Sequence, residues 1–118
     1  MSQAALTKDE ILNADDCRVE PVDMTEFGWP GIVYVGILRG NELERVAGLY
    51  KDGAPTGSDY LAKMAAVFLR DENGKRIIDD KEAGALGFKS GAALTHIVER
   101  GVKLNRIDDE TVDEAEKN

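Results

Sequence analysis

The chain has 118 residues, 42% of them hydrophobic, which is enough for one domain with a buried core and too few for two. Its 15 basic and 23 acidic residues give a net charge of −8, which argues against nucleic acid as a partner because phosphate neutralisation requires clustered Lys and Arg. No apolar run reaches the roughly 18 residues of a membrane span, and no signal peptide is visible. We therefore expect one cytoplasmic domain over residues 1–118 with no membrane partner.

Residues that could carry catalysis or bind a metal are scarce. Cys17 and His96 are the only cysteine and the only histidine, which excludes a disulfide framework and a zinc centre built on several Cys or His ligands. No motif supports pairing them as nucleophile and base. The segment Gly87-Phe88-Lys89-Ser90 departs from a phosphate-binding loop because Phe88 separates Gly from Lys. We predict no catalytic, cofactor or metal site and no enzymatic activity.

The first part of the chain predicts a short helix followed by a β-hairpin. Thr7 and Glu10 have the spacing of a capping box, so a helix begins there and ends near Asp15. Residues 18–26 and 31–38 are predicted strands, the second being rich in β-branched residues between glycines. The Gly- and Pro-rich segment 27–31 between them predicts the turn of an antiparallel hairpin.

The middle of the chain predicts two helices separated by a loop. Gly40 or Asn41 caps a helix that runs to about Tyr50, because apolar residues recur there at three- and four-residue spacing. Residues 51–57 contain two glycines and a proline, which predicts a loop. Ser58 or Asp59, at positions 58–59, caps the next helix.

The last third predicts a second hairpin and further helices. Asn73-Gly74 lies between the apolar runs 66–69 and 77–78, and Asn-Gly in such a place is a strong hairpin signal. A brief helix is expected from Asp79 or Asp80 to Leu86, and the longest helix from Ser90 to about Asn105. An acidic helix or tail follows over residues 108–118.

The fold class that these elements predict is α+β. We expect the two hairpins to form one antiparallel sheet with four or five helices, and the long helix near residues 90–105 to pack against that sheet.

The long helix has two contrasting faces. Its apolar face contains Leu94, Ile97, Val98, Gly101 and Val102, and the opposite face carries a basic stripe of Lys89, His96, Arg100 and Lys103. Such a stripe is either a solvated face or an interface with an acidic partner. Because residues 108–118 are acidic, including Asp109 and Glu110, we hypothesise that stripe and tail of neighbouring chains pair head to tail. Unchanged self-association at low salt after removal of 108–118 would contradict this.

Segments along nearly the whole sequence resemble the tail assembly chaperones of long-tailed bacteriophages. In the first half these are Leu12-Asn13-Ala14-Asp15-Asp16-Cys17, Val19-Glu20-Pro21-Val22-Asp23, Trp29-Pro30-Gly31 and Val33-Tyr34-Val35. In the second half they are Ala66-Val67-Phe68-Leu69, Asp71-Glu72-Asn73-Gly74, Leu86-Gly87-Phe88-Lys89-Ser90, Ala92-Ala93-Leu94 and the stretch from Asp109 to Asn118. The chain departs from the family pattern at Gly36, where a larger, often basic residue is expected.

The resemblance implies a non-enzymatic factor in tail morphogenesis. Such a chaperone binds and solubilises the tape measure protein in the host bacterial cytoplasm, multimerises around it as a weak homo-oligomer or ring, and is absent from the mature virion. The family is made in two forms, because a ribosomal frameshift appends a second domain to a minority of chains. This frameshift-extended form is a further expected partner, and through it the major tail protein. Glu116-Lys117-Asn118 can be encoded GAA AAA AAC, which contains a slippery heptamer.

Several residues are candidates for contact with a partner or a second copy: Trp29, Tyr34, Leu43, Tyr50, Lys89, His96, Arg100, Lys103, Asp109 and Glu110. Trp29 lies in the turn of the first hairpin and is either a packing residue or an exposed anchor. The alternative function is a small acidic regulator that mimics nucleic acid and blocks a DNA-binding partner. Acidic residues that are scattered among basic ones fit this alternative less well than an ordered acidic stripe would.

Overall fold

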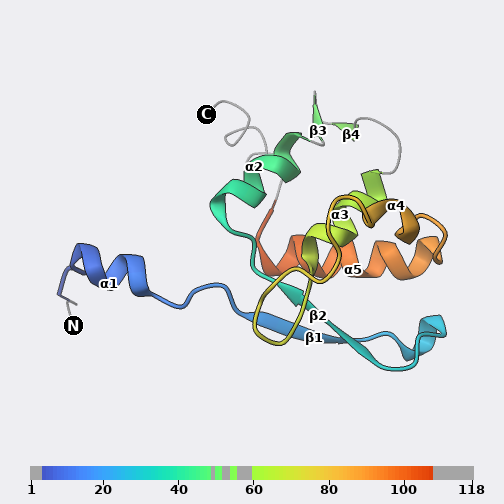
Figure 1. The fold of residues 1–118 in the computed structure, drawn as a ribbon, viewed down its shortest axis with the longest axis horizontal. Coiled ribbons are helices and arrows are strands. Elements are labelled where there is room, and N and C mark those ends of the chain that lie inside the picture. The colour runs from blue at the N-terminus through green and yellow to red at the C-terminus, as the bar shows by residue number, and fades with distance from the viewer. Residues whose placement is uncertain (1–3, 49, 52–53, 56–59, 108–118) are drawn as a thin grey trace.

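The computed structural model describes residues 4–48, 50–51, 54–55 and 60–107, and these have an α+β fold (Figure 1). The helices of this part of the chain are α1 (Lys8–Asn13), α2 (Gly40–Gly48), α3 (Tyr60–Phe68), α4 (Ala83–Leu86) and α5 (Gly91–Leu104). Its strands are β1 (Val19–Asp23), β2 (Ile32–Gly36), β3 (Tyr50–Lys51), β4 (Ala54–Pro55) and β5 (Leu69–Arg70). The fold class predicted from the sequence, a small antiparallel sheet with several helices, is confirmed.

Strands β1 and β2 form the predicted first hairpin. They are antiparallel, with Val22 opposite Val33. The connection contains a single 3-10 turn, η1 (Thr25–Phe27). This turn is capped at its C-terminus by Gly28, whose φ of 84° is in the left-handed region that favours glycine. The side chain of Asp23 fixes the start of this turn by accepting hydrogen bonds from the amide and the hydroxyl of Thr25.

The second hairpin differs from its prediction. The turn at Asn73-Gly74 is present, with a φ of 86° at Gly74, but the strand before it, β5, pairs with β2 and gives a sheet of order β1-β2-β5. The segment after the turn makes one isolated bridge, Arg70 to Arg76, and residues 77–78 form no strand. Residues 66–68 belong to α3 because they are buried on all sides, and an apolar run this short fits a buried helix as well as a strand.

The predicted loop at 51–57 contains paired backbone. Within the described residues, Tyr50 pairs with Pro55 and Lys51 with Ala54, so β3 and β4 form a two-stranded sheet. Helix α2 accordingly ends at Gly48 and does not reach Tyr50. The backbone of Tyr50 and Lys51 is hydrogen-bonded in this sheet, which replaces the helical bonds that the periodic pattern predicted. The proposed caps at positions 58–59 lie outside the described residues.

Helix α5 is the centre of the core. Figure 1 shows it between the β1-β2 hairpin on one side and α3 and α4 on the other. Ser90 caps it as predicted, with its hydroxyl accepting from the amide of Ala93 at 3.3 Å. Its buried residues are Ala93, Leu94, Ile97, Val98 and Gly101. Gly101 allows the closest approach to α3, because a Cβ at this position would lie 2.5 Å from two ring carbons of the buried Phe68.

A buried arginine connects the sheet to α2 and α3. Arg70 is only 3% exposed, donates from Nε to the carbonyl of Val67 at 3.0 Å and forms an ion pair with Glu42 at 2.8 Å. Burial alone would raise the pKa of Glu42, but hydrogen bonds from the Arg70 side chain and the Arg39 amide lower it below its ordinary value of 4.5. Gly36 makes room for this arrangement, because a Cβ there would lie 2.5 Å from Cγ of Arg70. This steric limit accounts for the glycine at position 36.

A second polar link joins the end of α5 to the end of β2. The side chain of Asn105 accepts from the amide of Leu38 at 2.7 Å and donates to the carbonyls of Gly36 at 3.1 Å and Gly101 at 2.9 Å. Three hydrogen bonds to backbone groups in two elements fix the position of the α5 C-terminus, where the candidate site lies.

Candidate partner-binding surface

The C-terminus of α5 ends in a Schellman motif. Arg106 has a φ of 54°, its amide donates to the carbonyl of Lys103 at 3.2 Å, and the amide of Ile107 donates to the carbonyl of Val102 at 3.0 Å. This pair of bonds turns the chain back, so that Ile107 is placed beside Val102, the usual apolar contact of the motif. Val102 and Ile107 are five residues apart and would face different sides of an uninterrupted helix. The reversal of the chain brings both side chains to one surface.

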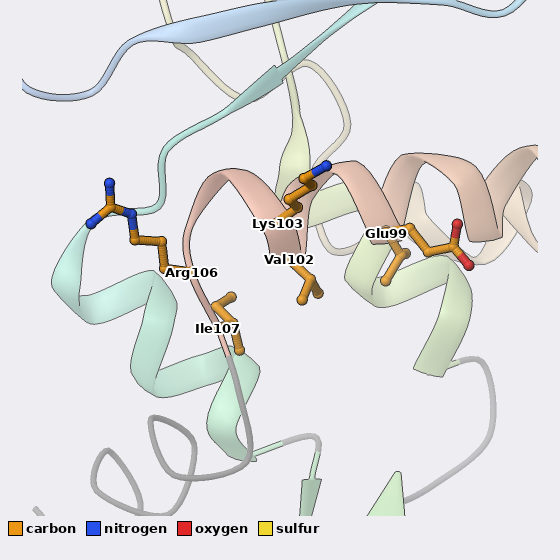
Figure 2. A pocket seen from close by; sticks show the side chains of 6 residues that line it. Glu99, Val102, Lys103, Arg106 and Ile107 are labelled. Carbon is orange, nitrogen blue, oxygen red and sulfur yellow. The ribbon is translucent and has the colours of Figure 1, made fainter.

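These residues line a groove on the surface of α5, which we call the α5 groove (Figure 2). Its lining consists of Val98, Glu99, Val102, Lys103, Arg106 and Ile107, and its volume is about 400 Å³. Figure 2 shows Val102 and Ile107 pointing toward the same space, on the side of α5 away from β1 and β2. Glu99 lies toward one end of this space and Arg106 toward the other. The groove therefore has an apolar floor and charged ends.

A second hollow lies on the neighbouring side of α5, toward β1. It is lined by Arg18, Glu20, Arg100, Lys103, Leu104 and Arg106, and its volume is about 360 Å³. Arg100 is ion-paired with Glu20. Lys103 and Arg106 line both hollows, so the α5 groove has a cationic edge. Positive charge is thus concentrated at the end of α5, in a chain whose net charge is −8.

The structure divides the predicted basic stripe. Arg100 and Lys103 lie together at the second hollow, where Arg18 and Arg106 join them. His96 is half-buried with its ring centroid 5.1 Å from that of Phe27, so it packs against the turn of the first hairpin. Lys89 is exposed at the other end of α5, immediately before the cap. Two of the four stripe residues thus remain near the candidate site.

The other predicted contact residues lie on different elements. Trp29 and Leu43 are half-buried and pack against the core, from the hairpin turn and α2 respectively. Tyr34 is half-buried on β2, opposite Pro21 and Arg70. Tyr50 belongs to β3, and its side chain is not described. Asp109 and Glu110, with the rest of the acidic segment, lie outside the described residues.

Large apolar side chains are exposed elsewhere on the surface. Ile11 and Leu12 of α1 are 57% and 73% exposed. Phe88, between α4 and α5, is 93% exposed. Leu6, Ile32 and Ile77 are also exposed.

The sequence pattern correctly placed Val98 and Val102 on the apolar face of the long helix, where Val98 is buried in the core and Val102 packs against it. It did not identify Arg106 and Ile107. The available signal was an apolar residue five positions after Val102, just beyond a helix C-terminus, which is the spacing of the Schellman contact. An arginine in the left-handed region gives no such signal, because glycine or asparagine is the usual residue there.

Among the described residues, no cluster of His, Cys, Asp and Glu side chains could hold a metal ion. The helices in this part of the chain are all too short or too polar to cross a bilayer. No protein-family model, curated protein or solved structure matches the chain.

Proposed function

We propose that this protein is a phage tail assembly chaperone that binds and solubilises the tape measure protein during tail morphogenesis, without enzymatic activity. The α5 groove is the observation that carries the proposal. A tape measure protein is a long apolar helix, and an apolar groove with polar ends suits the apolar face of a helix laid into it. The resemblance of many short sequence segments to this family supplies the identity of the client.

The charges of the chain support this role. A chaperone for an aggregating helix must cover apolar surface and keep the complex dissolved, and a net charge of −8 opposes association between coated complexes. Further exposed apolar residues, including Phe88 and Ile77, offer additional contact along an extended client. We place this activity in the cytoplasm of the bacterial host, before the virion is complete. The frameshift-extended form of the chain is the expected route to the major tail protein.

Co-expression with the tape measure protein encoded nearby tests the proposal. We expect the tape measure protein to become soluble and to co-purify with this chain. Val102→Asp places a charge on the floor of the groove and should abolish co-purification. Arg106→Glu, at the exposed end of the groove, should weaken it without touching the core. Lys81→Glu makes the same charge change at an exposed position outside the groove lining and is the matched control.

The proposal fails if the tape measure protein remains insoluble with both this chain and its frameshift-extended form. The assignment of binding to the α5 groove fails if the Val102→Asp and Arg106→Glu variants fold normally and co-purify with the tape measure protein as fully as the Lys81→Glu variant does.

A further inference from the structure

Helix α1 has no packing partner within the described chain. None of its residues is buried, and Leu6, Ile11 and Leu12 are 64%, 57% and 73% exposed. In Figure 1 it lies at one end of the longest axis, joined to β1 by an extended segment. A helix of six residues is far below the length at which an isolated helix is stable in water. Its formation would be favoured by contact with another surface.

The sequence of α1 nevertheless specifies a helix in detail. Both bonds of the capping box are present, from the Glu10 amide to the Thr7 hydroxyl at 3.2 Å and from the Thr7 amide to the Glu10 carboxylate at 3.0 Å. Leu6 and Ile11 occupy the positions of a hydrophobic staple around the cap. A helix start with this many local signals, carrying an apolar side that its own chain leaves exposed, is typical of a docking segment.

The α5 groove matches α1 in chemistry. The segment 4–16 carries four carboxylates, Asp9, Glu10, Asp15 and Asp16, and one cation, Lys8. The groove has the opposite balance, because its charged residues are Lys103, Arg106 and one carboxylate, Glu99. Apolar side chains are available on both surfaces, Ile11 and Leu12 on the helix and Val102 and Ile107 on the groove.

The two surfaces also match in length. Six helical residues span about 9 Å at 1.5 Å per residue. The helical part of the groove lining, from Val98 to Lys103, is also six residues long and covers the same rise of about 9 Å. Helix α1 therefore fits along the groove.

We propose that α1 of one chain docks in the α5 groove of a second copy. Ile11 and Leu12 cover Val102 and Ile107. The carboxylates of residues 4–16, which we call the arm, lie along the cationic edge formed by Lys103 and Arg106. The small size of the contact makes the association weak and concentration-dependent, and its charge complementarity makes it weaker at high salt. Docking of α1 in the α5 groove requires no tape measure protein. One consequence rests on the proposed function: a tape measure helix competes with α1 for the α5 groove.

Disulfide trapping between two differently tagged chains tests the contact directly. In a Cys17→Ser background, one chain carries Leu12→Cys and the other Val102→Cys, so that each has a single thiol. We expect the mixed disulfide to form faster than when Val102→Cys is replaced by Lys81→Cys, which is exposed on a different surface. Equal rates for the two pairs would overturn the proposal. An intrachain disulfide in the dilute Leu12→Cys/Val102→Cys double variant, without dimer, would place the arm on its own chain and would also overturn it.

Sedimentation equilibrium of the otherwise unaltered chain gives an independent test. Leu12→Asp should weaken self-association at least about tenfold, a loss of about 1.4 kcal/mol. Asn13→Asp adds the same charge at the next residue of α1. Its dissociation constant for self-association should stay within about twofold of the wild-type value, a much smaller change than the roughly tenfold weakening expected for Leu12→Asp. Neither change should lower the melting temperature, because α1 buries nothing. A monomer at every concentration, or equal association of the Leu12→Asp variant and the wild type, would refute docking by the arm.

Discussion

The contact between Gly101 of α5 and Phe68 of α3 allows one substitution to be worked through quantitatively. Gly101 is buried in the interior of α5, and a Cβ there would lie 2.5 Å from Cδ1 and from Cδ2 of Phe68. Real Cβ atoms do not approach a neighbour so closely, and the ring of Phe68 is completely buried, so it cannot swing into solvent. Gly101→Ala must therefore displace either the ring or one of the two helices.

Two opposing terms set the size of the effect. Alanine is favoured over glycine in a helix interior by about 1 kcal/mol. Overpacking a dense core costs typically 1–3 kcal/mol, and a clash with several ring atoms belongs at about 3 kcal/mol. The net loss is then about 2 kcal/mol of unfolding free energy. With an unfolding entropy of about 2.1 cal/mol/K per residue over about 100 residues, the melting temperature falls by about 10 °C.

Urea unfolding followed by circular dichroism measures this difference. Gly91→Ala is the matched control, because Gly91 begins the same helix and a Cβ there meets nothing within 4 Å. It should leave stability unchanged or raise it by up to about 1 kcal/mol. Phe68→Ala combined with Gly101→Ala provides a double-mutant cycle, in which removing Cγ and the ring of Phe68 should relieve the clash by at least about 1 kcal/mol of coupling.

Close packing of α3 on α5 would be refuted if Gly101→Ala were as stable as the Gly91→Ala control. An unfavourable effect of Gly101→Ala that persisted unchanged in the Phe68→Ala background would assign the clash to some other neighbour.

Three further predictions concern charge, backbone conformation and helix capping. Glu42 has a lower pKa in the folded state than its ordinary 4.5, so the stability it contributes is present above that pH and is lost as pH falls through the folded pKa. The difference in unfolding free energy between wild type and Glu42→Gln should therefore narrow in acid, and an equal difference at neutral and acid pH would contradict the ion pair with Arg70. Arg106→Gly should stabilise the fold by about 0.5–1 kcal/mol in urea unfolding, because it removes a left-handed penalty of about 1–2 kcal/mol at the cost of a more flexible unfolded chain. A net loss of stability would show that the Arg106 side chain contributes more than this strain. Ser90→Ala should cost about 1 kcal/mol of global stability, whereas Thr7→Ala should leave the melting temperature of the monomer unchanged; equal losses would mean that α1 packs on the body.

The local signals in the sequence predicted two helix starts and the turns well. Thr7 and Ser90 cap α1 and α5 with the expected bonds. The starts of two other helices were predicted wrongly: α2 already includes Gly40, and α4 begins only at Ala83, because Asp79 accepts from the Glu82 amide at 2.8 Å in a turn that precedes the helix. Gly28 and Gly74 both adopt the positive φ that their turns require. These features depend on hydrogen bonds and steric limits within three or four residues, and such interactions can be recognised without knowing the rest of the fold.

The candidate site was predicted less completely. Arg100 and Lys103 were identified as basic residues on the outer face of the long helix, and they do lie at the cationic end of α5. Arg18 could not be grouped with them, because it precedes β1 and is brought to α5 only when the hairpin packs there. Ile107 reaches the groove only because the chain reverses at Arg106.

Composition, caps and turns thus determined an acidic α+β chain, the positions of α1 and α5, and its first hairpin, because each depends on near neighbours in the sequence. Tertiary structure decided that residues 66–68 complete α3 and that 69–70 join the sheet, since the apolar run suits either and only packing on α5 and pairing with β2 select between them. It also decided which apolar faces were covered. Both α1 and α5 carry apolar side chains, yet those of α5 are largely buried and those of α1 are exposed, because a sequence specifies apolar side chains and only the fold supplies the surface that covers them.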